Sequence, residues 1–213
     1  MISQEPEGLR PSSVLKRRAI LAAAEESFLS GGYDGVTMDE IATASGVSKQ
    51  TVYAHFGTKD RLFVELVTAM AQGAADEVAA GRGAPPSREE VETWLVDLLD
   101  HQLALVIAPR LTRLRRLVIS EVPRHPELAR AVHEQGPARA VERLEEVLRE
   151  LDGRGWLRVP DPGVAAVQLN WLVMGAPTSD AMYLGEAAAP DPDSRRDHVR
   201  SAVATFVRSY YVP

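Results

Sequence analysis

Helical spacing of apolar residues runs through nearly all of the 213-residue chain, and it limits the fold more than any other feature. Apolar residues recur three and four positions apart, as they do on one face of an α-helix. The alternation of β-branched and polar residues that marks strands is absent, and no repeat of fixed period appears. The spacing therefore predicts an all-α protein.

Capping residues, glycines and prolines divide the chain into segments. Ser87 and Glu90 have the spacing of a capping box, which predicts a helix beginning at residue 87. Pro137 suits the first turn of a later helix. We expect residues 1–11 to be a flexible arm and residues 81–86, rich in Gly and Pro, to be the clearest break. The expected helices span about 13–30, 37–44, 48–56, 59–80, 87–107, 109–121, two segments from about 126 and 137, 161–184 and 194–211.

Residues 37–56 carry the strongest local signal. Two short segments capped by Thr37 and Ser48 are joined by a turn at Gly46, which is typical of a helix-turn-helix. Val52 and Phe56 share the inward face of the second helix. Its other sides suit a major groove, where Gln and Thr contact bases and Lys, Tyr and His contact phosphates. These outward residues are Lys49, Gln50, Thr51, Tyr53, Ala54 and His55. The same spacing also fits a small helical bundle that does not bind DNA.

The charge of the chain gives no general support for nucleic-acid binding. The net charge is −6, and the first 60 residues hold six basic and eight acidic residues. Binding to phosphates must therefore depend on local placement of charge. Local placement is favoured because the only three lysines, Lys16, Lys49 and Lys59, all lie in this segment.

Residues 14–62 resemble the DNA-binding domain of the TetR family of bacterial regulators. The resemblance rests on Arg17-Arg18-Ala19-Ile20-Leu21, Ala24, Phe28, Gly31-Gly32-Tyr33, Val36-Thr37-Met38, Ile41-Ala42, Ala44-Ser45-Gly46-Val47-Ser48 and Tyr53-Ala54-His55-Phe56-Gly57-Thr58-Lys59-Asp60-Arg61-Leu62. It implies a three-helix DNA-binding domain over residues 12–58 and a helical domain over 59–213 that binds an effector and forms a dimer.

The resemblance also implies roles for individual residues. Many family members have a small residue at the position of Gln50, which makes Gln50 the preferred reader of sequence. Phosphate contacts are implied for Thr37, Tyr53, His55 and Lys59, and base contacts for Lys49, Gln50 and Thr51. Arg17, Arg18 and Ser48 complete the predicted DNA-binding set.

The C-terminal part resembles the AefR-like subclass of the family over residues 117–129 and 136–140. This resemblance identifies a scaffold and not an effector. Within it, one helical stripe and one later helix hold candidate ligand-binding residues, namely Trp94, Leu98, His101 and Leu105, with Trp171 and Met174. Either these residues are core, or they line a cavity for a small hydrophobic ligand with a polar or aromatic end.

The polar residues of this part leave two further questions. The nine arginines from Arg110 to Arg149 either form solvated faces and ion pairs or bind an anionic effector. Asp97 and His101 lie four residues apart, but no third ligand is nearby, so we predict no metal site.

The last helix has an apolar face made of Val199, Ala202, Val203, Phe206 and Tyr210. This face either packs within its own subunit or against a second copy. The family resemblance favours the second copy, with the helix from residue 161 beside it in a four-helix dimer interface.

Several functions are disfavoured by what the sequence lacks. There is no cysteine, no Gly-rich phosphate loop, no G-x-S-x-G and no H-E-x-x-H, so we expect neither an enzyme nor a bound cofactor. No apolar run approaches the ~20 residues that cross a bilayer, and the polar N-terminus is unlike a signal peptide. We therefore expect no membrane partner and a cytoplasmic location.

The leading hypothesis is a homodimeric repressor that binds double-stranded palindromic operator DNA and is released by an unidentified small hydrophobic ligand. One alternative is regulation without a small ligand, through a protein partner or as a constitutive architectural binder. Another is a helical enzyme with a buried acid–base site, which no titratable cluster in the sequence supports. A large closed cavity in a ligand-free structure favours ligand sensing, whereas a filled core favours regulation without a ligand.

Overall fold

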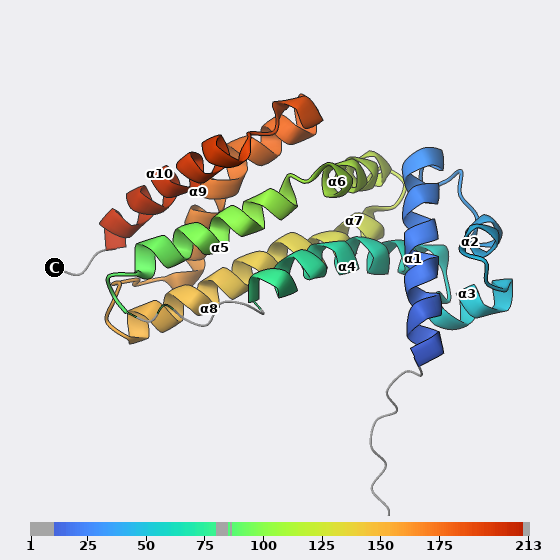
Figure 1. Ribbon diagram of the computed structural model, residues 1–213, viewed down its shortest axis with the longest axis horizontal. Helices are drawn as coiled ribbons and strands as arrows, with labels where there is room; N and C mark the ends of the chain where they lie inside the picture. Colours follow the sequence, from blue (N-terminus) through green and yellow to red (C-terminus); the bar gives the residue numbers. More distant parts are fainter. Residues whose placement is uncertain (1–10, 80–84, 86, 211–213) are drawn as a thin grey trace, which may run out of the picture. The chain divides into compact units, whose positions relative to one another are not determined.

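The computed structural model describes residues 11–79, 85 and 87–210, and for residues 11 and 70–79 it describes the helix alone. Every regular element in these ranges is a helix, which confirms the predicted all-α class (Figure 1). The chain forms two compact units, an N-terminal unit ending at Leu66 and a C-terminal unit beginning at Val67. The expected arm at residues 1–11 and the expected break at 81–86 lie almost wholly outside the described residues.

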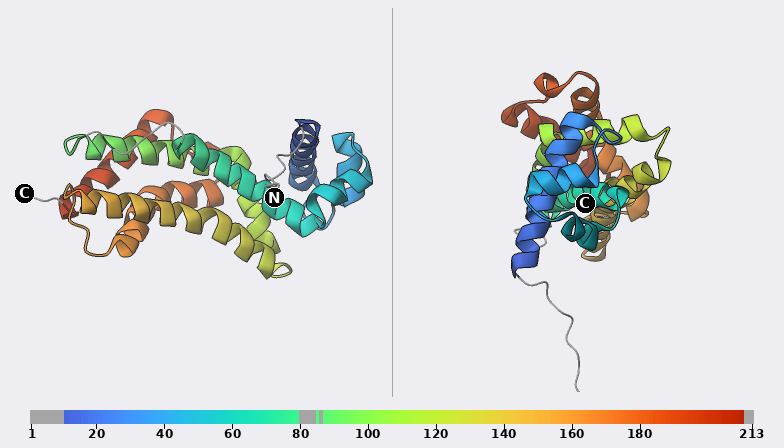
Figure 2. Two further views of the ribbon diagram at one scale, coloured as in Figure 1. Left: turned by 90° about the horizontal axis from the view of Figure 1, so that it is seen from below. Right: turned by 90° about the vertical axis from the view of Figure 1, so that its right-hand side faces the viewer.

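The N-terminal unit is a small helical bundle. Helix α1 packs on α2, and α2 packs on α3; Figure 2 shows α1 end-on with α2 and α3 to one side of it. Three rings fill its centre, with the Phe63 ring 4.9 Å from that of Phe28 and 5.2 Å from that of Tyr33. Edge-to-face pairs of this kind add about 0.5–1.5 kcal/mol beyond the burial of area. The helices are α1 (Pro11–Gly31), α2 (Met38–Ser45), α3 (Lys49–Phe56) and the first part of α4 (Lys59–Ala79).

The C-terminal unit has one continuous apolar core. Helix α9 packs on α8, and α10 packs on both α5 and α9, so leucines such as Leu99, Leu148 and Leu169 are completely buried. Each buried leucine contributes about 1.5–3 kcal/mol relative to exposure. The elements are α5 (Val91–Val106), α6 (Pro109–Glu121), α7 (Pro126–His133), η1 (Glu134–Ala138, a π-helical turn), α8 (Arg139–Gly153), α9 (Pro162–Tyr183), η2 (Glu186–Ala188, a 3₁₀ turn) and α10 (Pro192–Tyr210).

Two local predictions were wrong. Helix α5 begins at Val91 and not at Ser87, because the Ser87 hydroxyl bonds to Glu89 and Glu90 forms no side-chain cap. Residues 87–90 instead make a turn in which the Glu90 N–H donates to the Ser87 carbonyl at 3.3 Å. Pro137 does not open α8 but lies inside η1, where the wider π-helical turn accommodates it between α7 and α8.

Candidate nucleic-acid interface and ligand cavity

Helix α3 has one buried face and one exposed face. The Ser48 side chain caps its first turn by accepting from the Thr51 N–H at 3.2 Å, and Gly46 supplies the left-handed turn before it with φ of 68°. Val52 and Phe56 are completely buried beneath the helix. The exposed side chains are available to a DNA groove; they are Lys49, Gln50, Tyr53 and Ala54, with Thr51 and His55 half-buried at the flanks.

The start of α2 is fixed by the capping box predicted from the sequence. The Thr37 N–H donates to the Glu40 carboxylate at 2.8 Å, and the Glu40 N–H donates to the Thr37 hydroxyl at 3.2 Å. These bonds from Thr37 lower the pKa of Glu40 below its ordinary value. Thr37 is therefore held at an exposed helix N-terminus, a position that suits a phosphate.

Two cations predicted to contact phosphates are held inside the N-terminal unit. The Arg17 guanidinium pairs with the Glu65 carboxylate at 2.6 Å and lies over the Phe56 ring, 4.9 Å from its centroid. The Lys59 ammonium donates to the Tyr33 and Val36 carbonyls at 3.0 and 3.1 Å. Arg17 and Lys59 therefore stabilise the helical bundle that contains α2 and α3. Any phosphate contact must compete with these internal bonds.

The other predicted cations are more accessible. Lys49 pairs with Asp39 at 2.7 Å, and both side chains are exposed, so the pair is weak and easily exchanged. Arg18 is exposed and has no ion pair among the described residues. The Ser48 and Thr51 hydroxyls bond to each other at 2.8 Å, which orients Thr51 beside Gln50.

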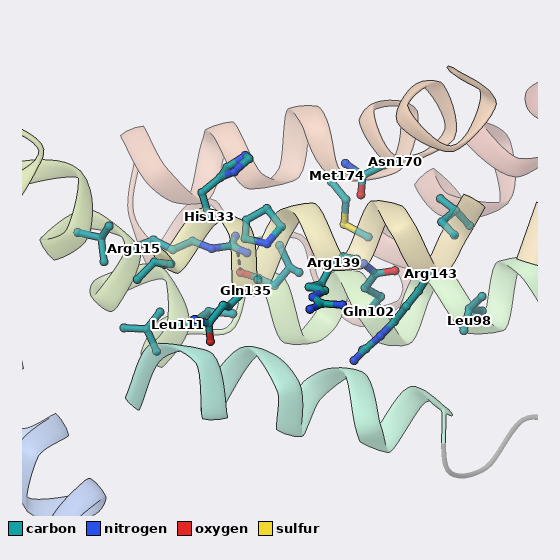
Figure 3. Close-up of a pocket in the computed structure, with 18 of the residues that line it drawn as sticks. Leu98, Gln102, Leu111, Arg115, His133, Gln135, Arg139, Arg143, Asn170 and Met174 are labelled. Carbon is teal, nitrogen blue, oxygen red and sulfur yellow. Dashed lines mark hydrogen bonds between the residues drawn. The ribbon is translucent and has the colours of Figure 1, made fainter. Parts of the chain in front are cut away.

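The C-terminal unit contains a partly open cavity of about 830 Å³, within the usual range for sites that bind small molecules. Figure 3 shows side chains of α5, α6, α8 and α9 directed into it. Its wall is mainly apolar, formed by residues such as Val67, Leu98, Leu111, Val118, Val132, Leu144, Val147 and Met174.

Three of the six predicted ligand residues, Trp94, Leu98 and Met174, line this cavity. His101 and Leu105 are half-buried on α5 but do not line it. The His101 Nε2 atom is buried with no hydrogen-bond partner among the described residues. Trp171 is 67% exposed and lies instead in a shallow groove between α9 and α10. The structure thus brings together half of the predicted set.

The ligand residues predicted from the sequence did not include the polar residues of the cavity, although three of these belong to the nine arginines for which an anionic effector was considered. The polar residues are Gln102 on α5, Arg115 on α6, His133 on α7, Gln135 in η1, Arg139, Arg143, Glu146 and Glu150 on α8, and Asn170 on α9. Helical spacing held a signal for one of them. Arg115 follows Leu111 by four residues and precedes Val118 by three, which places it on the apolar stripe of α6.

The structure corrects the predicted dimer surface. Val199, Ala202, Val203 and Phe206 are buried in the core of their own subunit, where α10 packs on α5 and α9. Side chains already enclosed in this way cannot be presented to a second copy. Tyr210 is half-buried and donates to the Gln168 side chain at 3.1 Å.

Helix α9 carries an exposed apolar face instead. Val164, Val167, Trp171 and Leu172 are between 42% and 67% exposed. Trp171 and Leu172 also line the groove that α10 borders with Thr205 and Ser209. We call Val164, Val167, Trp171 and Leu172 the α9 face. An exposed apolar patch of this kind marks association with another protein.

These features together define a class of protein. A helix-turn-helix unit with an exposed α3, followed by a helical unit with a mainly apolar cavity, is the organisation of a DNA-binding regulator. The comparison with known families agrees. Residues 20–66 match the bacterial regulatory proteins of the TetR family, and residues 93–212 match the C-terminal domain of AefR-like transcriptional repressors.

The second match alone covers more than half of the chain, so the chain belongs to the TetR family of transcriptional regulators. The family prediction is confirmed. Regulators of this family bind DNA and are not enzymes, which excludes the alternative of a helical enzyme.

Individual relatives support the same assignment. The chain is 32% identical over 117 residues to the HTH-type regulator YhgD of Bacillus subtilis, a match covering 52% of this chain and 60% of YhgD. The solved structure of a TetR-family protein from Mesorhizobium loti is similar to this one, with a TM-score of 0.82. The two sequences are 32% identical, and the match covers 95% of this chain and 100% of that chain. The flavonoid-responsive regulator FrrA is 28% identical, with a TM-score of 0.74 over 92% of this chain and 97% of its own. Within the described residues, no helix is both long and apolar enough to span a membrane.

Proposed function

We propose that this protein is a homodimeric, sequence-specific repressor whose release from operator DNA is caused by a small, largely hydrophobic ligand. The observation that carries the proposal is the cavity of about 830 Å³ in the C-terminal unit of a chain whose N-terminal unit holds a helix-turn-helix. A protein that regulated without a small ligand would be expected to fill this space with side chains.

The DNA contact comes from α3 of each subunit. Gln50 is the proposed reader of a base edge, with Lys49 and Thr51 beside it. Thr37, Tyr53, His55 and Arg18 are proposed to position the helix on phosphates. Two copies of α3 in a symmetric dimer would read the two halves of a palindromic operator.

The ligand acts by differential affinity for two conformations. If the conformation that opens around the ligand spaces the two α3 helices wrongly for adjacent major grooves, ligand binding and operator release share one coupling energy. Helix α4 is the proposed lever, because its Lys59 end belongs to the N-terminal unit and Val67 on the same helix lines the cavity. Ligand sensing on this scaffold is supported by its similarity to FrrA, a flavonoid-responsive regulator.

The dimer is proposed to form through the α9 face. Trp171 and Leu172 would meet their symmetry copies, with α10 bordering the interface. A cytoplasmic location follows as part of the proposal, since the operator is chromosomal DNA.

The test begins with selection of bound sites from random double-stranded DNA. We expect a palindromic site whose half-sites are about one helical turn apart or a multiple of it. Affinity for this site should then fall with salt. Arg18 of two subunits gives about two charged phosphate contacts, which predicts roughly a tenfold loss of affinity between 50 and 200 mM salt. No enriched sequence, or an affinity unaffected by salt, would contradict the DNA-binding proposal.

A further inference from the structure

Arg115 is an unusual residue in the cavity wall. It is half-buried on α6, and the cavity-lining Leu111 and Val118 lie on the same helix stripe. In Figure 3, Arg115 and Leu111 lie at one end of the cavity, whereas Arg143 and Leu98 lie at the other. A guanidinium therefore projects into a site whose wall is otherwise mainly apolar.

The Arg115 guanidinium is poorly neutralised by the protein. Its one hydrogen bond is from Nη1 to the Val106 carbonyl at 3.3 Å, and it has no ion pair among the described residues. A guanidinium has five N–H donors, so most of them are left for another partner. Burial without a compensating carboxylate lowers the pKa of Arg115, which reflects the free energy needed to hold the charge there.

The other charged residues of the cavity differ from Arg115. Arg139 is exposed and pairs with Glu142 at 3.6 Å, and Arg143 is exposed. Both acidic residues of the cavity wall are exposed: they are Glu146 and Glu150, and Glu150 pairs with Arg154 at 2.5 Å. Exposed charges are screened by water, whereas a half-buried cation beside apolar side chains gains much more from an anionic partner.

We propose that the cavity binds an amphipathic organic anion, whose carboxylate pairs with Arg115 and whose apolar body lies along the α5 and α9 side chains. This inference rests on the proposed function, because it names the ligand class of the same cavity. The planar guanidinium matches a carboxylate in a two-bond geometry that an alcohol cannot reproduce. Leu98 and Met174 supply apolar contacts farther along the cavity.

The experiment compares acids with the matching neutral alcohols by calorimetric titration of the full-length protein. One pair is aliphatic, decanoate and 1-decanol, and the other is aromatic, 1-naphthoate and 1-naphthalenemethanol. We expect at least one acid to bind at least about tenfold more tightly than its alcohol. Which pair shows this preference then distinguishes an aliphatic from an aromatic ligand body.

Arg115→Gln should weaken the preferred acid at least about tenfold and leave the affinity of its alcohol within about threefold. Arg115→Lys should restore part of the loss, because it keeps the charge without the planar fork. Arg130→Gln is the matched control, since Arg130 is exposed on α7 and does not line the cavity. Without ligand, Arg115→Gln should unfold at the same temperature as the unaltered protein or higher, because an unpaired, partly desolvated charge has been removed.

Equal affinity for acid and alcohol, or acid binding that is unchanged by Arg115→Gln, would overturn the anion proposal and leave ligand sensing in place. Binding of none of the four probes would also overturn it, and the DNA selection would still report on the regulator. If the acid binds through Arg115 but does not weaken operator affinity, the proposed anion site is supported. The proposal that a ligand releases the protein from its operator is then contradicted.

Discussion

At the residue scale, the chain uses its few N-terminal cations in two different ways. Arg17 pairs with Glu65, and Lys59 donates to the Tyr33 and Val36 carbonyls, so both cations stabilise the N-terminal bundle. Lys49 and Gln50 are exposed on α3. The acidic net charge of −6 is thus compatible with DNA binding, because a few outward side chains decide the contact.

Gln50→Ala should reduce affinity for the selected site by about 1–3 kcal/mol and leave affinity for scrambled DNA nearly unchanged. The reason is that a base contact is lost while the phosphate contacts remain. Arg18→Ala is the comparison: it should weaken both DNAs alike and flatten the dependence on salt. Paired titrations on the two DNAs measure both effects. Equal losses on both DNAs for Gln50→Ala would show that Gln50 reads no base.

At the scale of elements, α4 and η1 are joined by one specific bond. The buried Thr68 hydroxyl of α4 donates to the Gln135 side chain of η1 at 3.3 Å, and Gln135 lines the cavity. Single π-helical turns are frequent at functional sites. A ligand that displaces Gln135 would therefore act directly on the helix that leads from Lys59 into the C-terminal unit.

Thr68→Val should keep ligand binding but reduce the effect of ligand on operator affinity by about two- to tenfold, as expected for the loss of one hydrogen bond worth about 0.5–1.5 kcal/mol. Valine nearly preserves the shape of threonine, so packing changes little. Thr93→Val is the control, because Thr93 is exposed on α5 and does not line the cavity. Operator titrations with and without saturating decanoate, or whichever probe acid binds, give the coupling. A coupling equal to that of Thr93→Val would exclude this route.

At the scale of the whole molecule, the position of α10 decides how two copies can associate. Its apolar side is occupied by α5 and α9, and Arg195 and Arg196 add ion pairs to Asp100 and Asp97 at 2.8 and 2.5 Å. The α9 face is the apolar surface that these contacts leave exposed around Trp171. We therefore expect dimerisation to depend on α9 side chains and the fold to depend on α10.

Trp171→Glu should give a folded monomer in sedimentation experiments, because a charge on the α9 face must be desolvated in the dimer but not in the subunit. Leu15→Glu is the matched control: Leu15 is 66% exposed, close to the 67% of Trp171, but lies on α1. It should remain dimeric. Phe206→Glu should unfold the C-terminal unit, since Phe206 is only 3% exposed. A dimer unchanged by Trp171→Glu would refute the proposed interface.

The sequence by itself determined the helical class, the helix-turn-helix and the family. These depend on local features: the Thr37–Glu40 capping box, the turn at Gly46 and the inward spacing of Val52 and Phe56 act within a few residues of one another. Only the tertiary structure decided where each apolar stripe lies. Trp171 and Met174 are three residues apart on α9, yet one is 67% exposed and the other 6% exposed in the cavity wall. Helical periodicity predicts that a helix face is apolar, but the neighbouring helices determine whether that face lies in the core, in a cavity wall or against a partner. The packing of neighbouring helices also placed Arg115 in the cavity wall and α10 against α5.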